Sequence, residues 1–207
     1  MRINYPKIIF KITLILVFLI SILGGIALVL NESAKPSPKS KLIKPFLTQK
    51  VREHEPLVKK HAEEFGVADH TDVILAIMMQ ESGGRGEDPM QSSESLCGEV
   101  GCINDVEKSI EQGVEYFSKA LDASGGDIKL AVQSYNFGLG FINYVNENKE
   151  VYSEEIAIEF SKKMYDNAKD QSIYTCLREE SKQYNACYGD ILYARDVMEY
   201  KELFAVE

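Results

Sequence analysis

The feature that most constrains this chain is an uninterrupted apolar run near its start. Residues Ile12–Leu30 form nineteen positions without a charge, rich in isoleucine, leucine, valine and phenylalanine. A helix of about 20 apolar residues is long enough to cross the hydrocarbon core of a membrane. Arg2, Lys7 and Lys11 precede the run, and basic residues favour the cytoplasmic side. The sequence therefore predicts a cytoplasmic stub over 1–11, a single-pass transmembrane signal-anchor over 12–30 and an extracellular remainder.

A cleaved signal peptide is the alternative interpretation of this run. Its apolar part normally covers about 7–15 residues and is followed by small residues at a cleavage site. Here the run is longer, and it ends in Leu28, Val29 and Leu30 without a small-x-small pattern. The uncleaved anchor in the cell membrane is therefore favoured, and under both interpretations the remainder of the chain is exported.

The composition changes after the apolar run. Residues 31–49 are expected to form a linker, because Asn31–Pro45 contains prolines, serines and lysines and shows no apolar periodicity. The chain up to Pro45 has seven basic residues and one acidic residue, so the formal total of −9 leaves −15 for the rest. A domain this acidic is a poor partner for nucleic acid, because phosphate contacts need clustered lysine and arginine.

Four cysteines suit an exported domain, because disulfides persist in oxidising compartments. Cys97 and Cys102 are five positions apart, and Cys176 and Cys187 are eleven apart. Two local disulfides are the simplest of the three pairings that four cysteines allow. Zinc is the competing interpretation, but neither pair has the gap of about two to four residues that is usual between zinc ligands. We therefore expect two disulfides, no metal site and no cofactor.

Residues 50–207 show helical periodicity and no convincing alternation of the strand type. The clearest helix is predicted to begin after Asp105, a capping residue, and to end at Gly125-Gly126. Its apolar positions recur at helical spacing: Val106, Ile110, Val114, Phe117 and Leu121. We therefore expect a single, mainly α-helical globular domain.

Prolines, glycines and capping residues predict further helix boundaries. Pro56 suits a first helical turn, and Gly66 suits a helix end. Asp69 or Thr71 can cap a second helix that runs to Glu81. Later helices are expected to begin near residue 127 and to cover about 154–167 and 190–204, with a long loop over 87–104.

Glu81 is the candidate general acid. It follows Ile77 by four positions and Met78 by three, so a helix places it on the same face as the apolar stripe. A carboxyl group beside apolar side chains loses hydration, which raises its pKa. A carboxyl group that stays protonated near neutral pH can protonate a leaving oxygen. The alternative is an ordinary solvent-facing glutamate at a helix end, and spacing alone does not exclude it.

Three short motifs at and after Glu81 occur in an order known from one superfamily. They are Gln80-Glu81-Ser82-Gly83-Gly84, Pro89-Met90-Gln91 and Ser134-Tyr135-Asn136-Phe137-Gly138. Together they resemble the catalytic Glu-Ser motif, the Met-Gln segment and the Tyr-Asn-x-Gly signature of the goose-type lysozyme and lytic transglycosylase superfamily. The resemblance covers roughly Val51 to Phe204 and implies a lysozyme-like fold for the domain predicted over 50–207.

The runs Met90–Ser95, Ser109–Phe117 and Tyr188–Asp190 carry a closer likeness. They are similar to the lysozyme-like domains of membrane-anchored wall hydrolases from Gram-positive conjugative elements. This likeness implies peptidoglycan as the substrate, the outer side of the membrane as the location, and a conjugation or secretion machine as a partner. The Cys97–Cys102 loop departs from the family pattern, because a disulfide would replace a proline-containing turn.

The resemblance also implies roles for single residues. Glu81 would protonate the leaving oxygen of the β-1,4 bond between N-acetylmuramic acid and N-acetylglucosamine, which is the reaction of a muramidase. Tyr135 would hydrogen-bond Glu81 or the sugar, with core packing as the alternative, and Asn136 has turn formation as its alternative. The full set expected at the substrate is Ser82, Gln91, Glu94, Tyr135 and Asn136.

A second carboxylate would decide the outcome of the reaction. Paired carboxyl groups lie about 5–5.5 Å apart in retaining glycosidases and about 6.5–9.5 Å apart in inverting ones. The candidates are Asp88, Glu94 and Asp105, of which Glu94 is preferred and Asp105 is more simply a helix cap. Without a second carboxylate, the substrate's own hydroxyl would attack and give the 1,6-anhydro product of a lytic transglycosylase. A non-catalytic peptidoglycan-binding module is the remaining alternative.

Overall fold

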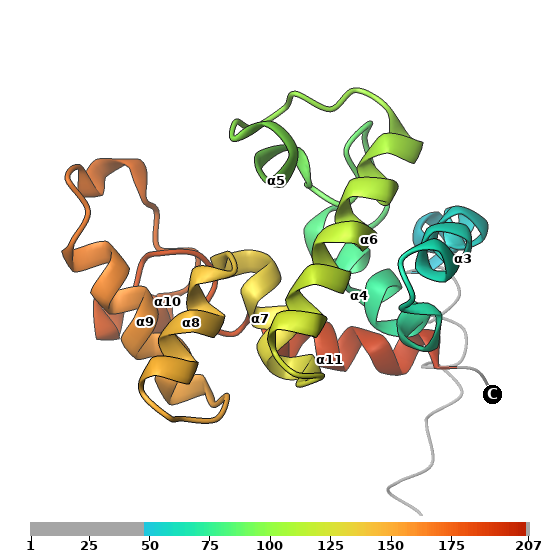
Figure 1. Cartoon of the computed structure of the whole chain (residues 1–207). Helices are drawn as coiled ribbons and strands as arrows, with labels where there is room; N and C mark the ends of the chain where they lie inside the picture. The colour runs from blue at the N-terminus through green and yellow to red at the C-terminus, as the bar shows by residue number, and fades with distance from the viewer. Residues whose placement is uncertain (1–47, 206–207) are drawn as a thin grey trace, which may run out of the picture. The chain divides into compact units, whose positions relative to one another are not determined.

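The computed structural model describes residues 48–205 (Figure 1). The predicted cytoplasmic stub, the anchor over 12–30 and the linker up to residue 47 lie outside the described residues. Among the helices of residues 48–205, none is both long and apolar enough to cross a membrane. This part of the chain folds into helices joined by turns and contains no strand, which confirms the mainly α-helical prediction for it.

The helices follow one another in chain order. Residues 48–53 are helical and lead through a turn at His54 into the first labelled helix. The labelled elements are α3 (Glu55–Glu64), η1 (Ala68–His70), α4 (Thr71–Glu81), α5 (Ser93–Cys97), α6 (Val106–Ala123), α7 (Ile128–Phe137), α8 (Gly140–Glu147), α9 (Glu154–Asp166), η2 (Gln171–Ile173), α10 (Glu179–Tyr184) and α11 (Tyr193–Phe204).

Side-chain caps fix the start of three of these helices. The carboxylates of Asp105 and Asp127 accept hydrogen bonds from backbone amides in the first turns of α6 and α7. The hydroxyl of Ser153 does the same for α9. Such caps satisfy amides that have no partner within the helix. The predicted start of α6 after Asp105 and the predicted start of α7 near Asp127 are therefore confirmed.

The predicted cap of α4 is wrong. His70 occupies the N-cap position and makes no capping hydrogen bond through its side chain. The 3-10 turn η1 leads directly into α4, and the hydroxyl of Thr71 donates to the carbonyl of Ala68 at 2.8 Å instead. The predicted loop over 87–104 also differs, since it contains the short helix α5.

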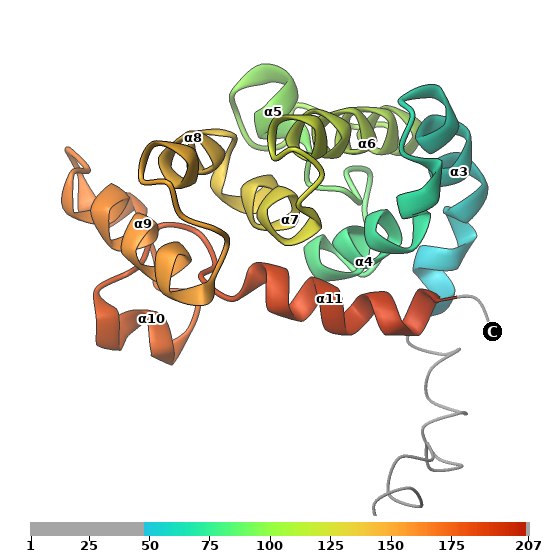
Figure 2. The same cartoon turned by 60° about the horizontal axis from the view of Figure 1, so that its bottom comes forward.

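The helix α4 lies at the centre of the core. Its residues Val73 to Met78 are all buried, because helices surround it on several sides. It packs against α11 and against α3, while α7 packs against α6 and α11. Figure 2 shows α11 running beneath both α4 and α7. The last helix of the described chain therefore closes the underside of the helix that ends at Glu81.

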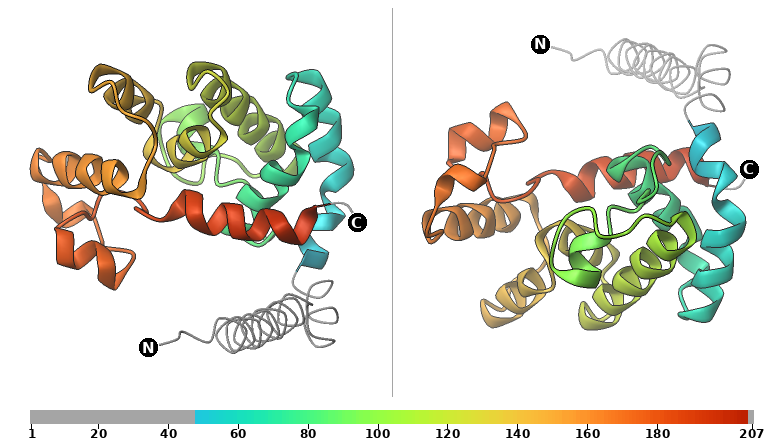
Figure 3. Two further views of the ribbon diagram at one scale, coloured as in Figure 1. Left: turned by 90° about the horizontal axis from the view of Figure 1, so that it is seen from below. Right: turned by 90° about the horizontal axis from the view of Figure 1, so that it is seen from above.

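The aromatic part of the same hydrophobic core joins α7, α8 and α9. The rings of Phe137, Phe141 and Phe160 lie with centroids 5.0–5.5 Å apart, the distance of favourable aromatic contacts. Figure 3 shows α8, α9 and α10 gathered at one end of the domain, and α3 at the other. The disulfide Cys176–Cys187 closes the segment around α10, as its spacing predicted.

Candidate active site

Glu81 is the last residue of α4, where the buried helix reaches the surface. Its side chain is half-buried beside Ile77 and Met78, which are fully buried. Burial removes water from the carboxyl group and raises the pKa of Glu81 to about 7. The structure thus gives Glu81 the protonation behaviour that the sequence predicted for a general acid.

Tyr193, the first residue of α11, is the hydrogen-bond partner of this carboxyl group. Its buried hydroxyl donates to Oε1 of Glu81 at 2.5 Å. This bond favours the ionised carboxylate and lowers the pKa of Glu81, whereas burial and the nearby charges of Asp88 and Asp190 raise it. The pKa near 7 is therefore a balance in which burial outweighs the hydrogen bond.

The glycine turn after Glu81 is held by Ser82. The hydroxyl of Ser82 donates to the carbonyl of Pro89 at 2.7 Å and accepts from the amide of Gly84 at 3.0 Å. Ser82 therefore stabilises the turn, and it is not among the residues that line the groove described below. The sequence placed Ser82 at the substrate, and that role stays a prediction; in the structure its hydroxyl holds the turn that follows Glu81.

Gly84 lets this turn pack against the helical residues 48–53. A Cβ atom on Gly84 would lie 2.8 Å from the backbone carbonyl carbon of Lys50 and the backbone nitrogen of Val51. The φ angle of Gly84 is +75°, a left-handed value that residues with a Cβ atom adopt reluctantly. The imidazole Nε2 of His54 lies 3.1 Å from the carbonyl oxygen of Gly84 and ties the two segments together.

Glu81 opens into a polar pocket of about 200 Å³. The pocket lies between the end of α4, the segment around α5 and the C-terminal half of α7. It brings together residues that are far apart in the chain: Glu81, Asp88, Gln91, Ser93, Glu94, Val100, Tyr135 and Asn136. Of the six residues that the sequence assigned to catalysis or substrate binding, all but Ser82 line this pocket.

A second pocket of about 250 Å³ extends the first. The two share Gln91, Glu94, Tyr135 and Asn136, so they form one groove with Glu81 towards one end. The second pocket adds two tyrosine rings, those of Tyr116 and Tyr188, together with backbone and small side chains. A groove with polar groups and half-buried tyrosine rings suits an extended ligand that carries many hydroxyl and amide groups.

Asp88 is the second carboxylate next to Glu81 in this groove. Its oxygens accept hydrogen bonds from the hydroxyls of Ser109 and Ser93, both at 2.6 Å, and from the amides of Ser92 and Ser93. Partial burial alone would raise the pKa of Asp88, but these hydrogen bonds outweigh burial and lower it. The groove therefore combines a protonatable carboxyl group, Glu81, with a carboxylate that stays ionised, Asp88.

The other carboxylate candidates differ in position. Glu94 is exposed and lines both halves of the groove, in agreement with its predicted place at the substrate. Asp105 caps α6 through a hydrogen bond from the amide of Lys108 at 2.8 Å and does not line the groove. The simpler prediction for Asp105, a helix cap, is therefore confirmed.

Tyr135 and Asn136 use their polar atoms within the protein. The hydroxyl of Tyr135 donates to the carbonyl of Met90 at 3.0 Å and not to Glu81, which was one of its two expected partners; Tyr193 makes the bond to Glu81. The side-chain oxygen of Asn136 accepts from the amide of Asp190 at 2.7 Å. Both residues thereby hold the floor of the groove while their remaining surface lines it.

Gln91 and the neighbouring loop form the rim. Gln91 has a left-handed backbone with φ of 48°, and its exposed side-chain amide donates to the carbonyl of Asp88 at 2.8 Å. The disulfide Cys97–Cys102 closes the loop that carries Val100, a 77% exposed residue that lines the pocket of Glu81. The predicted pairing of the cysteines is thus confirmed, and this loop shapes one wall of the site.

The site contains no arrangement suited to a metal ion in the part of the chain that the structure describes. Among residues 48–205, no three histidine, cysteine, aspartate or glutamate side chains are placed so that they could hold a metal ion together. All four cysteines are paired in the two disulfides.

Known proteins are similar to more than half of this chain. The bifunctional muramidase/DL-endopeptidase CwlT of Bacillus subtilis (strain 168) is 43% identical over 116 residues, which are 56% of this chain and 35% of CwlT. The uncharacterized membrane protein YocA of the same strain is 37% identical over 160 residues, which are 75% of this chain and 70% of YocA. This chain therefore spans about a third of CwlT and more than two thirds of YocA.

A solved structure supports the same relationship. The crystal structure of a lipoprotein-like protein of the NLP/P60 family from Staphylococcus aureus subsp. aureus Mu50 superimposes with a TM-score of 0.64 at 38% sequence identity. The match covers 73% of this chain and 52% of that protein. A family model described as lysozyme-like matches residues 48–201, which are well over half of the sequence. The chain therefore belongs to the lysozyme-like family.

Proposed function

We propose that this protein cleaves the glycan strands of peptidoglycan as a muramidase, with Glu81 as the general acid. One observation carries the proposal: the half-buried carboxyl group of Glu81, with its pKa raised to about 7, faces a groove that also holds an ionised carboxylate. The family match and the muramidase named among the relatives support the substrate class.

The proposed reaction begins with a proton transfer. Protonated Glu81 donates to the oxygen of the β-1,4 bond between N-acetylmuramic acid and N-acetylglucosamine as the C1–O bond breaks. Glu81 becomes a carboxylate, and the hydroxyl of Tyr193 stabilises that charge through its hydrogen bond. The sugar carbon C1 develops positive charge, which the ionised carboxylate of Asp88 stabilises electrostatically. A water molecule then attacks C1 and returns its proton to Glu81.

A lytic transglycosylase is the second candidate. The oxygens of Asp88 accept several hydrogen bonds from Ser92, Ser93 and Ser109, which leaves this carboxylate little capacity to position an attacking water. In that case Glu81 is the only group that donates and accepts protons. After it has protonated the leaving oxygen, its carboxylate takes the proton of the muramic 6-hydroxyl as that oxygen attacks C1, and a 1,6-anhydro product forms. A non-catalytic binding module is the third, and the raised pKa of Glu81 argues against it.

The proposal extends to the location of the protein. The apolar run over 12–30 would hold the domain at the outer face of the membrane, where peptidoglycan lies. One relative of this chain is named a membrane protein, which supports that arrangement. A conjugation or secretion machine that needs a local opening in the wall would be the partner of a membrane-anchored enzyme of this kind.

The test is mass spectrometry of the fragments that the full chain, solubilised in detergent, releases from purified peptidoglycan. Reducing muramic ends are expected for a muramidase, and 1,6-anhydromuramic ends would assign the second candidate. Glu81→Gln preserves the shape of the side chain and removes the acid, so it is expected to release no fragments. Equal cleavage by this variant, or no cleavage by either protein, would overturn the proposal.

A further inference from the structure

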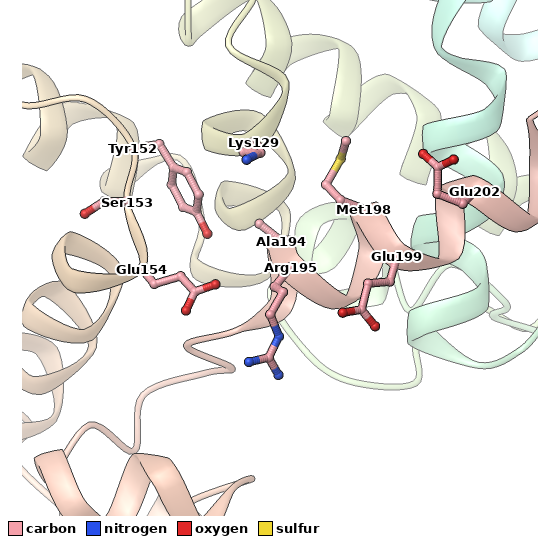
Figure 4. Close-up of a pocket in the computed structure, with 9 residues that line it drawn as sticks. All are labelled: Lys129, Tyr152, Ser153, Glu154, Ala194, Arg195, Met198, Glu199 and Glu202. Carbon is pink, nitrogen blue, oxygen red and sulfur yellow. The ribbon is translucent and has the colours of Figure 1, made fainter. Parts of the chain in front are cut away.

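A separate pocket of about 400 Å³ lies between α7, the segment that leads into α9, and α11 (Figure 4). This volume falls within the range of about 300–1,000 Å³ that is typical of sites for small ligands. Its lining comes from three parts of the chain: Lys129, Tyr152, Ser153, Glu154, Ala194, Arg195, Met198, Glu199 and Glu202.

This pocket lies on the other side of α11 from Glu81. Tyr193 and Arg195 are two positions apart on that helix, which turns about 200° between them. Tyr193 is buried against Glu81, whereas Arg195 is exposed in the pocket. A sugar held at Glu81 therefore cannot occupy this pocket, and any ligand here is bound at a second place.

Three of the five charged side chains that line the pocket lack an ion-pair partner among residues 48–205. Lys129, Glu154 and Glu199 form no ion pair there, and Arg195 contacts only Asp196, through Nε at 3.1 Å. Figure 4 shows Arg195 and Glu199 projecting on the same side of α11 without meeting. The pocket thus offers free basic and acidic groups within one cavity, in a domain that is strongly acidic as a whole.

Apolar surface lies between these charges. The methyl group of Ala194, the side chain of Met198 and the ring of Tyr152 contribute to it, and the ring of Tyr152 packs edge-on against Phe141. The hydroxyl of Tyr152 has its nearest acceptor, Oε1 of Gln133, at 3.5 Å, which is long for a hydrogen bond. Figure 4 shows this hydroxyl directed towards the space between Glu154 and Arg195, where it can bond a ligand.

We propose that this pocket binds a short zwitterionic peptide, namely an uncross-linked peptide stem of peptidoglycan. Its carboxylates would pair with Arg195 and Lys129, and its free amino group with Glu154 and Glu199. Apolar side chains of the peptide would cover Tyr152 and Met198. An anion of high charge is a worse fit, because the pocket also presents carboxylates of its own.

This inference rests on the proposed function, because the peptide stem is attached to the glycan that Glu81 would cut. The peptide in the pocket would be attached to a sugar some distance along the polymer from the bond that is cleaved. When the pocket holds the peptide, the glycan attached to that peptide is concentrated near the groove. General electrostatic attraction cannot concentrate it, because both the domain and the wall are anionic. We expect the pocket to lower KM for intact peptidoglycan and to leave the cleavage of peptide-free glycan unchanged.

The experiment is isothermal titration of the full chain in detergent with the tetrapeptide L-Ala–γ-D-Glu–L-Lys–D-Ala. The wild-type protein and Glu81→Gln are expected to bind it equally, because Glu81 is outside the pocket. Arg195→Gln and Glu199→Gln are expected to weaken binding by about tenfold each, the loss of one charge-assisted contact. Lys119→Gln, which breaks an exposed ion pair with Glu115 on α6, is the control and leaves binding unchanged.

Two further measurements separate the inference from the proposed function. A tetrapeptide with an acetylated amino group and amidated carboxylates is expected not to bind, and Arg195→Gln is expected to raise KM only for peptide-bearing glycan. No binding by the wild type, equal binding of the blocked peptide, or full binding by both pocket variants overturns the inference. Peptide binding without glycan cleavage refutes the proposed function alone, whereas cleavage without peptide binding refutes the inference alone.

Discussion

The hydroxyl of Tyr193 donates a hydrogen bond to the carboxyl group of Glu81 across 112 positions of sequence. The bond lowers the pKa of Glu81 against the larger effect of burial. The hydrogen bond and the nearby charges that act on Glu81 can be removed one at a time by mutation, and each removal should shift the pKa of Glu81 in a known direction.

Tyr193→Phe removes the hydrogen bond and keeps the ring. The pKa of Glu81 should then rise above its value of about 7, so the alkaline limb of the pH–rate profile moves to higher pH. The maximal rate should fall by about tenfold, because the carboxylate formed during proton transfer loses a charge-assisted bond. Tyr200→Phe, on the same helix, serves as the control. An unchanged alkaline limb would show that the bond does not act on Glu81.

Asp88→Asn should move the same limb in the opposite direction. The charge of Asp88 raises the pKa of Glu81, so its removal lowers that pKa. Profiles of cleavage rate against pH for Tyr193→Phe and Asp88→Asn should therefore lie on opposite sides of the wild-type profile. A shift of both variants in one direction would contradict this electrostatic assignment.

Asp88→Asn should also reduce stability in a pH-dependent way. Hydrogen bonds lower the folded-state pKa of Asp88, so the ionised group stabilises the fold above its ordinary pKa and loses this effect as pH falls through the folded value. Chemical unfolding should show a deficit of about 1–3 kcal/mol at neutral pH, which shrinks in acid. A deficit that is constant with pH would point to the loss of shape alone.

Glu81→Gln should stabilise the fold at neutral and alkaline pH. The folded-state pKa of Glu81 is about 7, above its ordinary value of 4.5, so the folded protein binds more protons between these values. The free energy of unfolding of the wild type therefore falls as pH rises through this window. The variant should exceed the wild type by about 1–3 kcal/mol above pH 7 and match it near pH 4, measured by chemical unfolding.

Gly84→Ala should destabilise the domain more than Gly86→Ala does. Both glycines have positive φ, +75° and +82°, but only at Gly84 would a Cβ meet backbone atoms, 2.8 Å away in Lys50 and Val51. The shared backbone strain costs about 1 kcal/mol or more in each variant, and the clash adds about 1–3 kcal/mol at Gly84. The difference in free energy of unfolding between the two variants, measured by thermal unfolding, isolates the cost of the clash. Equal losses of stability would show that residues 48–53 shift to make room for the Cβ atom without a cost.

The sequence predicted the features of the site that are set by residues close together in the chain. The apolar run of α4 and the motif that ends it place Glu81 correctly, and the Met-Gln and Tyr-Asn motifs place Gln91 and Tyr135 in its pocket. The cap Asp105 was evident because a capping bond joins residues only three positions apart, and the start of a helix near Asp127 was predicted as well.

The contacts that tune Glu81 were not predictable in the same way. The contact between Tyr193 and Glu81 was not predicted, since no periodicity relates the start of α11 to the end of α4. Asp88 was one candidate of three, and its selection depends on serines from two separate segments that meet only in the folded domain. The short helix α5 lacks the length that an apolar repeat needs to become visible.

The packing of α11 beneath α4 has a consequence for the order in which the protein acquires its chemistry. Ribosomes make α4 long before α11, so a partly synthesised chain holds Glu81 without the helix that covers its underside. Such a carboxyl group is hydrated and ionised at neutral pH, and it lacks the proton that a leaving oxygen requires. If Glu81 is the general acid that we propose, the nascent chain cannot cleave glycan, and Glu81 gains its raised pKa only after α11 has packed against α4.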